Sequence, residues 1–338
     1  MNRRTALSIL AAGAARHVAG ADDAWAAETS AGLAAMDKGH RSEAEQHFAL
    51  ALSQAREAKV GGLVLAQCLD NLARATDPNR GGRRELYRES LAIREGLLKP
   101  DDPELARSLV RFALASGLRQ GDPDEAEKMF ARATKIAGAA GTPELSAEVK
   151  EAHGLFRHSN YRIGVDSSDL LQRVEPLYRE VLAIREKLPG DDEIALAQIL
   201  EMMSVLFRET QRDEEANRLF ARATPIRRRH FEALSPAPYT LREPFRIGGG
   251  VSAPGILSKR EPEYSDLARM LKWQGTVVLT LVVSETGATD SIRLTRGLGL
   301  GLDEQSLLAV REWVFKPGMR QGAPVRVIAS VEVNFRLL

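Results

Sequence analysis

The sequence has little of what marks many enzymes, nucleic-acid-binding proteins and membrane proteins. A single cysteine, Cys68, excludes an intrachain disulfide and a zinc site built from several thiolates. The 47 basic and 46 acidic side chains nearly cancel, which argues against a broad attraction to nucleic acid or to a membrane surface. A membrane span needs about 20 mostly apolar residues, and no such stretch is present. With 338 residues, the chain is long enough for two domains.

Motifs for catalysis or cofactor binding are also missing. Gly297–Gly301 alternates glycine with leucine, but it lacks G-x-G-x-x-G spacing and no parallel βαβ unit follows. We expect a flexible strand-to-helix connection there, with Asp303 as the N-cap of the next helix. Gly248–Gly250 lacks the Gly-Lys-Ser/Thr ending of a phosphate loop. The six histidines are scattered without acidic partners at zinc-ligand spacing. We therefore expect no enzyme activity, no cofactor and no metal site.

Residues 251–338 predict one small α+β domain. Gly275–Val283 is apolar and rich in β-branched residues, which favours a strand. Ser284–Gly287 has the composition of a turn, and Thr289–Leu294 continues as a second strand. A helix is expected from Glu304 to about Trp313.

The end of the chain predicts a third strand. Lys316-Pro317-Gly318 should end the preceding helix. From Val325 to Leu337 every odd position is apolar, and the even positions except Ile328 are polar or charged. A period of two places one face on a core and the other in water. We therefore predict a three-stranded antiparallel sheet that is covered on one side.

Several short pieces of this segment occur in a recognisable order. They are Pro262-Glu263-Tyr264, Leu267-Ala268-Arg269, Gly275-Thr276-Val277-Val278, Gly287, Leu302-Asp303-Glu304 before the helix, Trp313-Val314-Phe315-Lys316-Pro317-Gly318 after it, and Val331-Glu332-Val333-Asn334-Phe335. Together they resemble the C-terminal domain of the TonB family of energy transducers over Val251–Leu338. One departure is Ser265, which stands where the family usually has proline.

The resemblance implies a peptide-binding strand at the end of the chain. An edge strand offers unpaired N–H and C=O groups to an extended peptide. In the TonB family the final strand takes a short segment of an outer-membrane receptor in this way, which points to Val325–Phe335 here. The candidate residues are Arg326, Ile328, Ser330, Glu332, Asn334 and Arg336. The alternative is that each is an ordinary exposed strand residue. Trp313 and Phe315 are expected in the core.

Residues 28–232 contain an internal repeat. Leu86–Glu95 returns as Leu177–Glu186, and Met129–Thr134 returns as Leu219–Thr224, with a fainter relative at His47–Leu52. The repeated aromatic anchors are Phe48, Tyr87, Phe130, Tyr178 and Phe220. A second helical stretch lies between successive anchors, so we predict a helix hairpin repeated about five times.

Small residues accompany the anchors at regular offsets. They are Gly32, Gly39, Ala44 and Ala51 in the first unit, and Gly121, Ala126 and Ala133 in the third. The units resemble tetratricopeptide repeats, particularly the longer variety of kinesin light chains. That resemblance implies an all-α solenoid whose concave face holds an unknown peptide or protein, while the anchors and small residues only hold the stack. Residues Asn160–Asp169 predict a longer loop in the fourth unit.

The two parts are joined by a predicted linker at residues 233–250. Ser235-Pro236-Ala237-Pro238 and Gly248-Gly249-Gly250 mark it. It is much shorter than the proline-rich span that TonB-family transducers usually have.

Residues 1–27 resemble an export signal. Arg3-Arg4 precedes an apolar run at Ala6–Ala15, and Ala24-Trp25-Ala26 offers a small-x-small cleavage site. The start also resembles a twin-arginine signal. The prediction is a periplasmic protein cleaved near Ala26. The alternatives are an uncleaved, inner-membrane-associated protein that faces the periplasm, and a cytoplasmic protein with an alanine-rich first helix.

Three functional hypotheses follow. The first is a periplasmic adaptor that binds a receptor peptide by strand addition and a second protein through its repeats, in association with TonB-dependent transport. The second is a genuine energy-transducing component, which needs an anchor or a docking partner. The third is a scaffold that self-associates, for example as a homodimer, by pairing of strand edges. All three have protein partners, and none binds nucleic acid.

Overall fold

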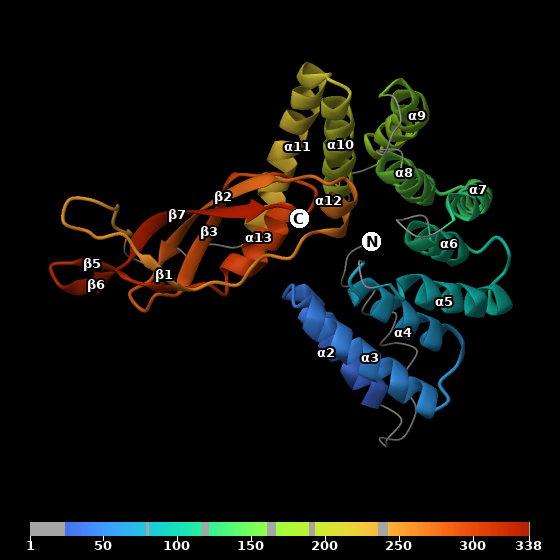
Figure 1. The fold of residues 1–338 in the computed structure, drawn as a ribbon, viewed down its shortest axis with the longest axis horizontal. Coiled ribbons are helices and arrows are strands. Elements are labelled where there is room, and N and C mark those ends of the chain that lie inside the picture. Colours follow the sequence, from blue (N-terminus) through green and yellow to red (C-terminus); the bar gives the residue numbers. More distant parts are fainter. Residues whose placement is uncertain are drawn as a thin grey trace. The chain divides into compact units, whose positions relative to one another are not determined.

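The computed structural model describes residues 24–78, 81–116, 122–160, 167–188, 193–235 and 243–337 (Figure 1). Three predicted features fall wholly or partly outside these ranges: residues 1–23 of the export signal, 161–166 of the long fourth loop and 236–242 of the linker. Gly121 also lies outside them. The chain forms two compact units, Met1–Val149 with Lys187–Asp192, and Lys150–Glu186 with Glu193–Leu338.

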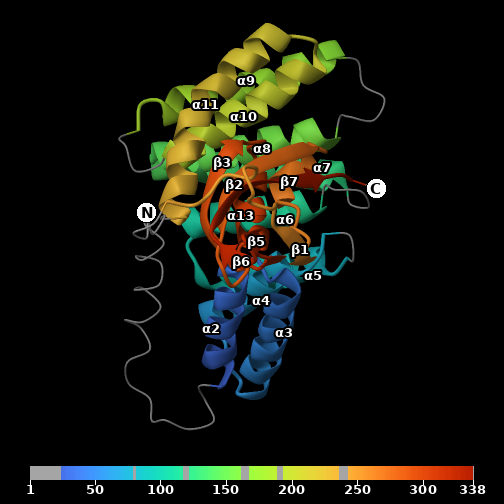
Figure 2. The ribbon, with the colours of Figure 1, turned by 90° about the vertical axis from the view of Figure 1, so that its left-hand side faces the viewer.

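In the described ranges before residue 236, the chain forms helices that pair as hairpins. Their bounds are α2 Ala24–Asp37, α3 Arg41–Glu57, α4 Gly62–Ala75, α5 Arg83–Leu97, α6 Pro103–Ser116, α7 Pro123–Ala140, α8 Pro143–Asn160, α9 Ser167–Arg185, α10 Glu193–Glu209 and α11 Asp213–Leu234. Figures 1 and 2 both show α2 and α3 side by side. The predicted helical-repeat fold class of this region is confirmed.

The small residues of the repeat let the two helices of a hairpin approach each other. A Cβ added to Gly32 of α2 would lie 2.5 Å from Cε1 of Phe48 in α3. A Cβ on Gly154 of α8 would lie at the same distance from Cε1 of Tyr178 in α9. Both aromatic side chains are fully buried. Glycine at these positions is therefore required by packing, because any side chain would displace the anchor.

An apolar cluster that includes the single cysteine packs between the helices of the first two hairpins, α2–α3 and α4–α5. Cys68 of α4 is 3% exposed and packs with Leu52, Leu69 and Trp25. Trp25 belongs to the first turn of α2, which begins at Ala24. The predicted cleavage position near Ala26 therefore lies inside this helix.

The C-terminal part contains the predicted three-stranded sheet. Strands β2 (Gly275–Val283), β3 (Thr289–Arg296) and β7 (Val327–Phe335) are antiparallel in the order β3-β2-β7. Helix α13 (Leu302–Val310) contacts β2 and β3, and the apolar residues of β7 are buried. Trp313 and Phe315 are 6% and 2% exposed, so their predicted core positions are confirmed.

Two short ladders extend this sheet domain and correct the predicted boundaries. β1 (Gly255–Ser258) pairs with β4 (Val314–Lys316), and β5 (Gly318–Arg320) pairs with β6 (Ala323–Val325). The last strand thus begins at Val327 rather than Val325. The prediction that residues 316–318 end a helix is wrong, since they lie between and within two strands.

The helix before them also differs from its predicted form. Helix α13 begins at Leu302 and ends at Val310, with Gly301 as its N-cap. Asp303 lies in its first turn instead, and its carboxylate accepts the backbone N–H groups of Leu298 and Gly299 at 2.7 and 3.2 Å. The connection is therefore held by hydrogen bonds and is not the flexible loop that its glycines predicted.

Ser265, the departure from the family pattern, has a local structural role. It is the N-cap of the short helix α12 (Asp266–Met270), where its Oγ accepts the N–H of Ala268 at 3.1 Å. Its hydroxyl also donates to the carbonyl of Leu300 at 2.5 Å. Serine thus starts a helix and fastens it to the loop before α13.

Candidate peptide-binding edge

Strand β7 has one buried face and one exposed face. Its odd positions pack into the core, and Phe335 meets Tyr264 edge-to-face with ring centroids 5.5 Å apart. The Tyr264 hydroxyl donates to the carbonyl of Trp273 at 2.6 Å, which fixes that ring. Four of the six candidate residues are exposed, namely Ser330, Glu332, Asn334 and Arg336. The other two, Arg326 and Ile328, are half-buried.

One edge of β7 is fully used by the sheet. Its register with β2 runs without a shift from Val327 opposite Val283 to Phe335 opposite Gly275. In an antiparallel pair, alternate residues direct their N–H and C=O groups to the neighbouring strand and the others direct them away. The ladder with β2 therefore uses the N–H and C=O groups of every second residue of β7.

A short segment covers the start of the opposite edge. The N–H of Phe245 donates to the carbonyl of Arg326 at 2.8 Å, and the N–H of Ile328 donates to the carbonyl of Phe245 at 2.9 Å. The bridge is parallel. These bonds show that the even residues of β7 direct their main-chain groups away from β2. Arg326 and Ile328 are thus already paired within the chain.

The remaining part of that edge, Ser330–Asn334, is here named the open edge. By the same alternation the N–H and C=O groups of Ser330, Glu332 and Asn334 face away from β2. Within residues 243–337 no strand pairs with β7 on this side. A row of such groups is a template for an added strand, and each ladder bond contributes about 0.5–1.5 kcal/mol net.

The side chains beside the open edge are polar and mostly tied to the sheet. The Thr276 hydroxyl donates to Oδ1 of Asn334 at 2.6 Å. Arg326 forms an ion pair with Asp290 at 2.7 Å, beyond the open edge. Glu332 and Arg336 are exposed and of opposite charge. The open edge therefore presents outward main-chain groups, with the charges of Glu332 and Arg336 beside them.

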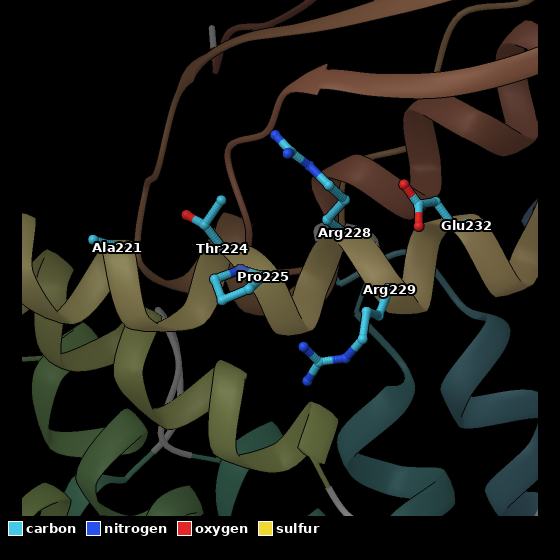
Figure 3. A pocket seen from close by; sticks show the side chains of 6 residues that line it. All are labelled: Ala221, Thr224, Pro225, Arg228, Arg229 and Glu232. Carbon is cyan, nitrogen blue, oxygen red and sulfur yellow. The ribbon is translucent and has the colours of Figure 1, made fainter.

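The residues that the structure describes include a shallow hollow but no cluster of metal-binding side chains. They contain no group of three or more His, Cys, Asp and Glu side chains that could hold a metal ion. A shallow hollow of about 520 Å³ lies along α11. Figure 3 shows that Arg228 and Arg229, which line it, point to opposite sides of the helix. Such divergent side chains do not converge on a ligand.

A second polar site, which sequence reasoning missed, lies between α10, α11 and the loop before α13. The carboxylate of Glu201 accepts Nε and Nη2 of Arg227 at 2.8 and 2.7 Å, and the backbone N–H of Leu300 at 2.8 Å. Arg227 also donates from Nη1 to Glu304 at 2.9 Å. Burial, the largest cause, raises the pKa of Glu201.

Burial also raises the pKa of Asp303 to about 7, with Glu304 adding to the shift. The sequence did carry a signal for this cluster. Asp303 and Glu304 are acidic residues that follow the glycine–leucine run Gly297–Leu302, and Arg227 stands three residues after the repeated segment Leu219–Thr224. No pattern in the sequence connected them across 77 positions, which is the separation of Arg227 and Glu304.

Phe245 was missed for another reason. It lies between Pro244 and a run of three glycines, in a stretch predicted as linker. Residues 248 and 251 exchange main-chain hydrogen bonds at 3.0 and 3.1 Å, so this stretch forms a turn that returns to the sheet domain. The alternation of Phe245 and Ile247 was the available signal.

Two family models match the chain. Residues 260–337 match the Gram-negative bacterial TonB protein C-terminal family, and residues 84–139 match the tetratricopeptide repeat. Both resemblances drawn from the sequence are therefore confirmed for these segments. Both are families of protein-interaction modules. Among the described residues no helix has the length and apolarity to cross a membrane.

Individual proteins resemble separate parts of the chain. Protein tonB2 of Pseudomonas aeruginosa is 33% identical over 84 residues, which are 25% of this chain and 31% of that protein. This chain thus spans about a third of the length of that relative. Two solved structures are each similar over 63% of this chain. BtubC (BKLC) from P. vanneervenii is 20% identical, with 83% of its own chain covered and a TM-score of 0.44. A putative kinesin light chain from Podosopora anserina is 15% identical, with 99% of its own chain covered and a TM-score of 0.46.

Proposed function

We propose that this protein is a periplasmic adaptor of the TonB type. It takes an extended segment of an outer-membrane receptor by strand addition at the open edge, and it holds a second protein partner through its helical repeats. This places it in association with TonB-dependent transport. The match of residues 260–337 to the TonB C-terminal family supports the first interaction, and the repeat match at 84–139 supports the second.

The pairing of Phe245 is the observation that carries the proposal. It supports the proposal because Phe245 bonds to two outward groups of this edge, the C=O of Arg326 and the N–H of Ile328. The open edge continues the same row of groups toward the C-terminus. A peptide that added to it would extend the sheet from three strands to four.

Proline substitution in the open edge tests strand addition. Glu332→Pro removes an N–H that faces away from β2, so the ladder with β2 should persist while peptide binding is lost. We expect at least a tenfold weaker affinity for synthetic peptides copied from the periplasmic N-terminal segments of outer-membrane receptors, measured by calorimetry. Ser330→Pro should behave in the same way.

Glu332→Ala is the matched control, because it removes the same side chain but keeps the N–H. It should bind within threefold of the unmodified chain. Circular dichroism and the thermal midpoint should confirm an intact sheet in each variant. Undiminished binding by a folded Glu332→Pro variant would mean that the peptide uses another edge.

An energy-transducing component is the second candidate, favoured by the similarity to Protein tonB2. The adaptor requires cleavage near Ala26 and recovery from the periplasm, whereas the transducer requires an intact Met1 terminus in the inner-membrane fraction. Cell fractionation with terminal peptide mass distinguishes the two. An intact terminus in the cytoplasm would contradict both.

Self-association is the third candidate, because a strand with one unpaired edge can also pair with the same strand of a second copy. Sedimentation velocity measures this directly. A dimer that Glu332→Pro converts to a monomer would support the scaffold, and a monomer that binds receptor peptide would support the adaptor.

A further inference from the structure

A buried ion pair recurs at one position of the repeat. Arg94, Arg185 and Arg227 each stand seven residues after the aromatic anchor of their hairpin. Each has a carboxylate partner on the preceding helix. The pairs are Arg94 with Asp70 at 2.9 Å, Arg185 with Glu151 at 3.7 Å and Arg227 with Glu201 at 2.7 Å. All six residues are less than 9% exposed.

The neighbour that completes the pair differs between hairpins. In the hairpin α4–α5, Asp70 also accepts Nη1 of Arg111 at 3.2 Å, and Arg111 belongs to α6 of the following hairpin. In the hairpin α10–α11 no further repeat follows in the described chain. There the loop before α13 and the first turn of α13 complete the pair, since Leu300 of the loop donates its N–H to Glu201 and Glu304 of the helix accepts from Arg227.

The loop is shaped to fit the carboxylate of Glu201. Gly299 has a φ of +73°, and a Cβ on it would lie 2.5 Å from Cδ of Glu201. Leu300, the next residue, is 1% exposed. A side chain at Gly299 would therefore be strained and would also collide with the last hairpin.

Other contacts extend this interface on both sides of the ion pair. The guanidinium of Arg208 in α10 lies 5.9 Å from the centroid of the Trp273 ring. Arg311, just after α13, donates to the carbonyl of Leu234 at the end of α11. The C-terminal domain thus contacts the middle and the end of α10, and Arg227 and the end of α11.

We propose that the hairpin α10–α11 is the docking platform for the C-terminal domain, which takes the place that a following repeat would occupy. The repeat's ion pair, which elsewhere joins one hairpin to the next, here joins the repeats to the strand-presenting domain. The domain that contains the open edge is consequently held by its contact with α10–α11 as well as by its covalent connection through residues 236–242. A partner that binds α10–α11 would then act directly on the domain that presents β7.

Cutting the connection between the two parts tests this docking. A sequence-specific protease site is placed within residues 236–242 of the full chain, and the purified protein is cut and passed over a size-exclusion column. The two pieces should elute together at micromolar concentration. Separate elution of the pieces from the unmodified sequence would overturn the proposal.

Two variants locate the contact. Gly299→Ala places a Cβ against Glu201, and its control is Gly249→Ala, because Gly249 also has a positive φ, +60°, but no atom within 4 Å of an added Cβ. After cutting, Gly299→Ala should weaken association at least tenfold, and Gly249→Ala should leave it unchanged.

Glu201→Ala tests the same contact from the helical side, where it cannot act by misfolding the C-terminal domain itself. It should also weaken association at least tenfold. Association that survives both Gly299→Ala and Glu201→Ala would overturn the docking role of this ion pair.

Discussion

The hairpins α4–α5 and α10–α11 contain the same buried ion pair but differ in what they hold. Asp70 and Arg94 join their hairpin to α6, whereas Glu201 and Arg227 join theirs to the loop before α13. The first neighbour is another repeat, with a charged side chain. The second belongs to a different fold and contributes a backbone N–H and a carboxylate. The same buried ion pair of the repeat therefore contacts two kinds of neighbour.

The difference shows how a helical array can end on an unrelated domain. Without a third partner, the ion pair of the last hairpin would leave buried polar atoms without hydrogen-bond partners, which is costly. A loop rich in glycine can bring its main chain close enough to supply the missing donor. The third hairpin has Ala137 seven residues after Phe130, so the pair is not needed to close a hairpin.

Removing one arginine should affect the two hairpins unequally. Arg227→Met leaves Glu201 buried beside Asp303 and Glu304, and should lower the free energy of unfolding by about 3–5 kcal/mol. Arg94→Met leaves Asp70 with Arg111 as a partner, so about 1–3 kcal/mol is expected. Urea unfolding followed by tryptophan fluorescence measures both. Equal losses would show that the third partner has no energetic importance.

Replacing the whole pair by leucine should sharpen the contrast. Asp70→Leu with Arg94→Leu removes both charges and leaves Arg111 near Glu104, so the change in unfolding free energy should stay within about 1 kcal/mol. Glu201→Leu with Arg227→Leu removes the acceptor of the buried Leu300 N–H and should cost about 1–3 kcal/mol. The same urea titration applies, and a larger loss in α4–α5 would contradict the comparison.

The free energy of unfolding should depend on pH through the Asp303 carboxyl, which lies beside the hairpin α10–α11. Asp303 has a pKa of about 7 in the folded protein, above its ordinary value of 3.8. Glu201, Glu304 and Arg227 face it. The folded state thus binds the proton more tightly, so the stabilisation is complete below pH 3.8 and is lost as the pH rises to about 7.

The slope of this loss is at most about 1.4 kcal/mol per pH unit for one group. Urea titrations at intervals from pH 4 to pH 8 measure it. Asp303→Asn, which removes the titrating carboxyl but keeps one oxygen that can accept the Leu298 N–H, should flatten the slope. An unchanged slope in Asp303→Asn would contradict the assignment to this carboxyl.

Much of the fold could be predicted because its information is local. Aromatic anchors recur at a steady interval in the repeats, and the alternation after Val325 predicts a strand with one buried face. What failed was also local: Asp303 resembles an N-cap, and Lys316-Pro317-Gly318 resembles a helix stop. Tertiary pairing of β4 with β1, and of β5 with β6, overrode the helix-stop signal, and the Asp303 carboxylate accepts the N–H groups of Leu298 and Gly299 in the preceding loop.

The candidate site was predictable in part. Periodicity identified the exposed side chains of Ser330, Glu332, Asn334 and Arg336, but it could not show which edge of β7 stays open. That depends on strand order and on Phe245, which is 82 residues before Val327 in the chain. The contact between Glu201 and Leu300 spans 99 residues and uses a backbone N–H, which no side-chain pattern reports.

Amide hydrogen exchange at Leu300 tests most directly whether Glu201 holds the C-terminal domain. In the unmodified chain this N–H should exchange as slowly as the amides of β2. Glu201→Ala should accelerate it at least tenfold, and Asp70→Ala should leave it unchanged. Rapid exchange of Leu300 in the unmodified chain, or a rate that Glu201→Ala does not alter, would contradict the role of the last hairpin as a platform.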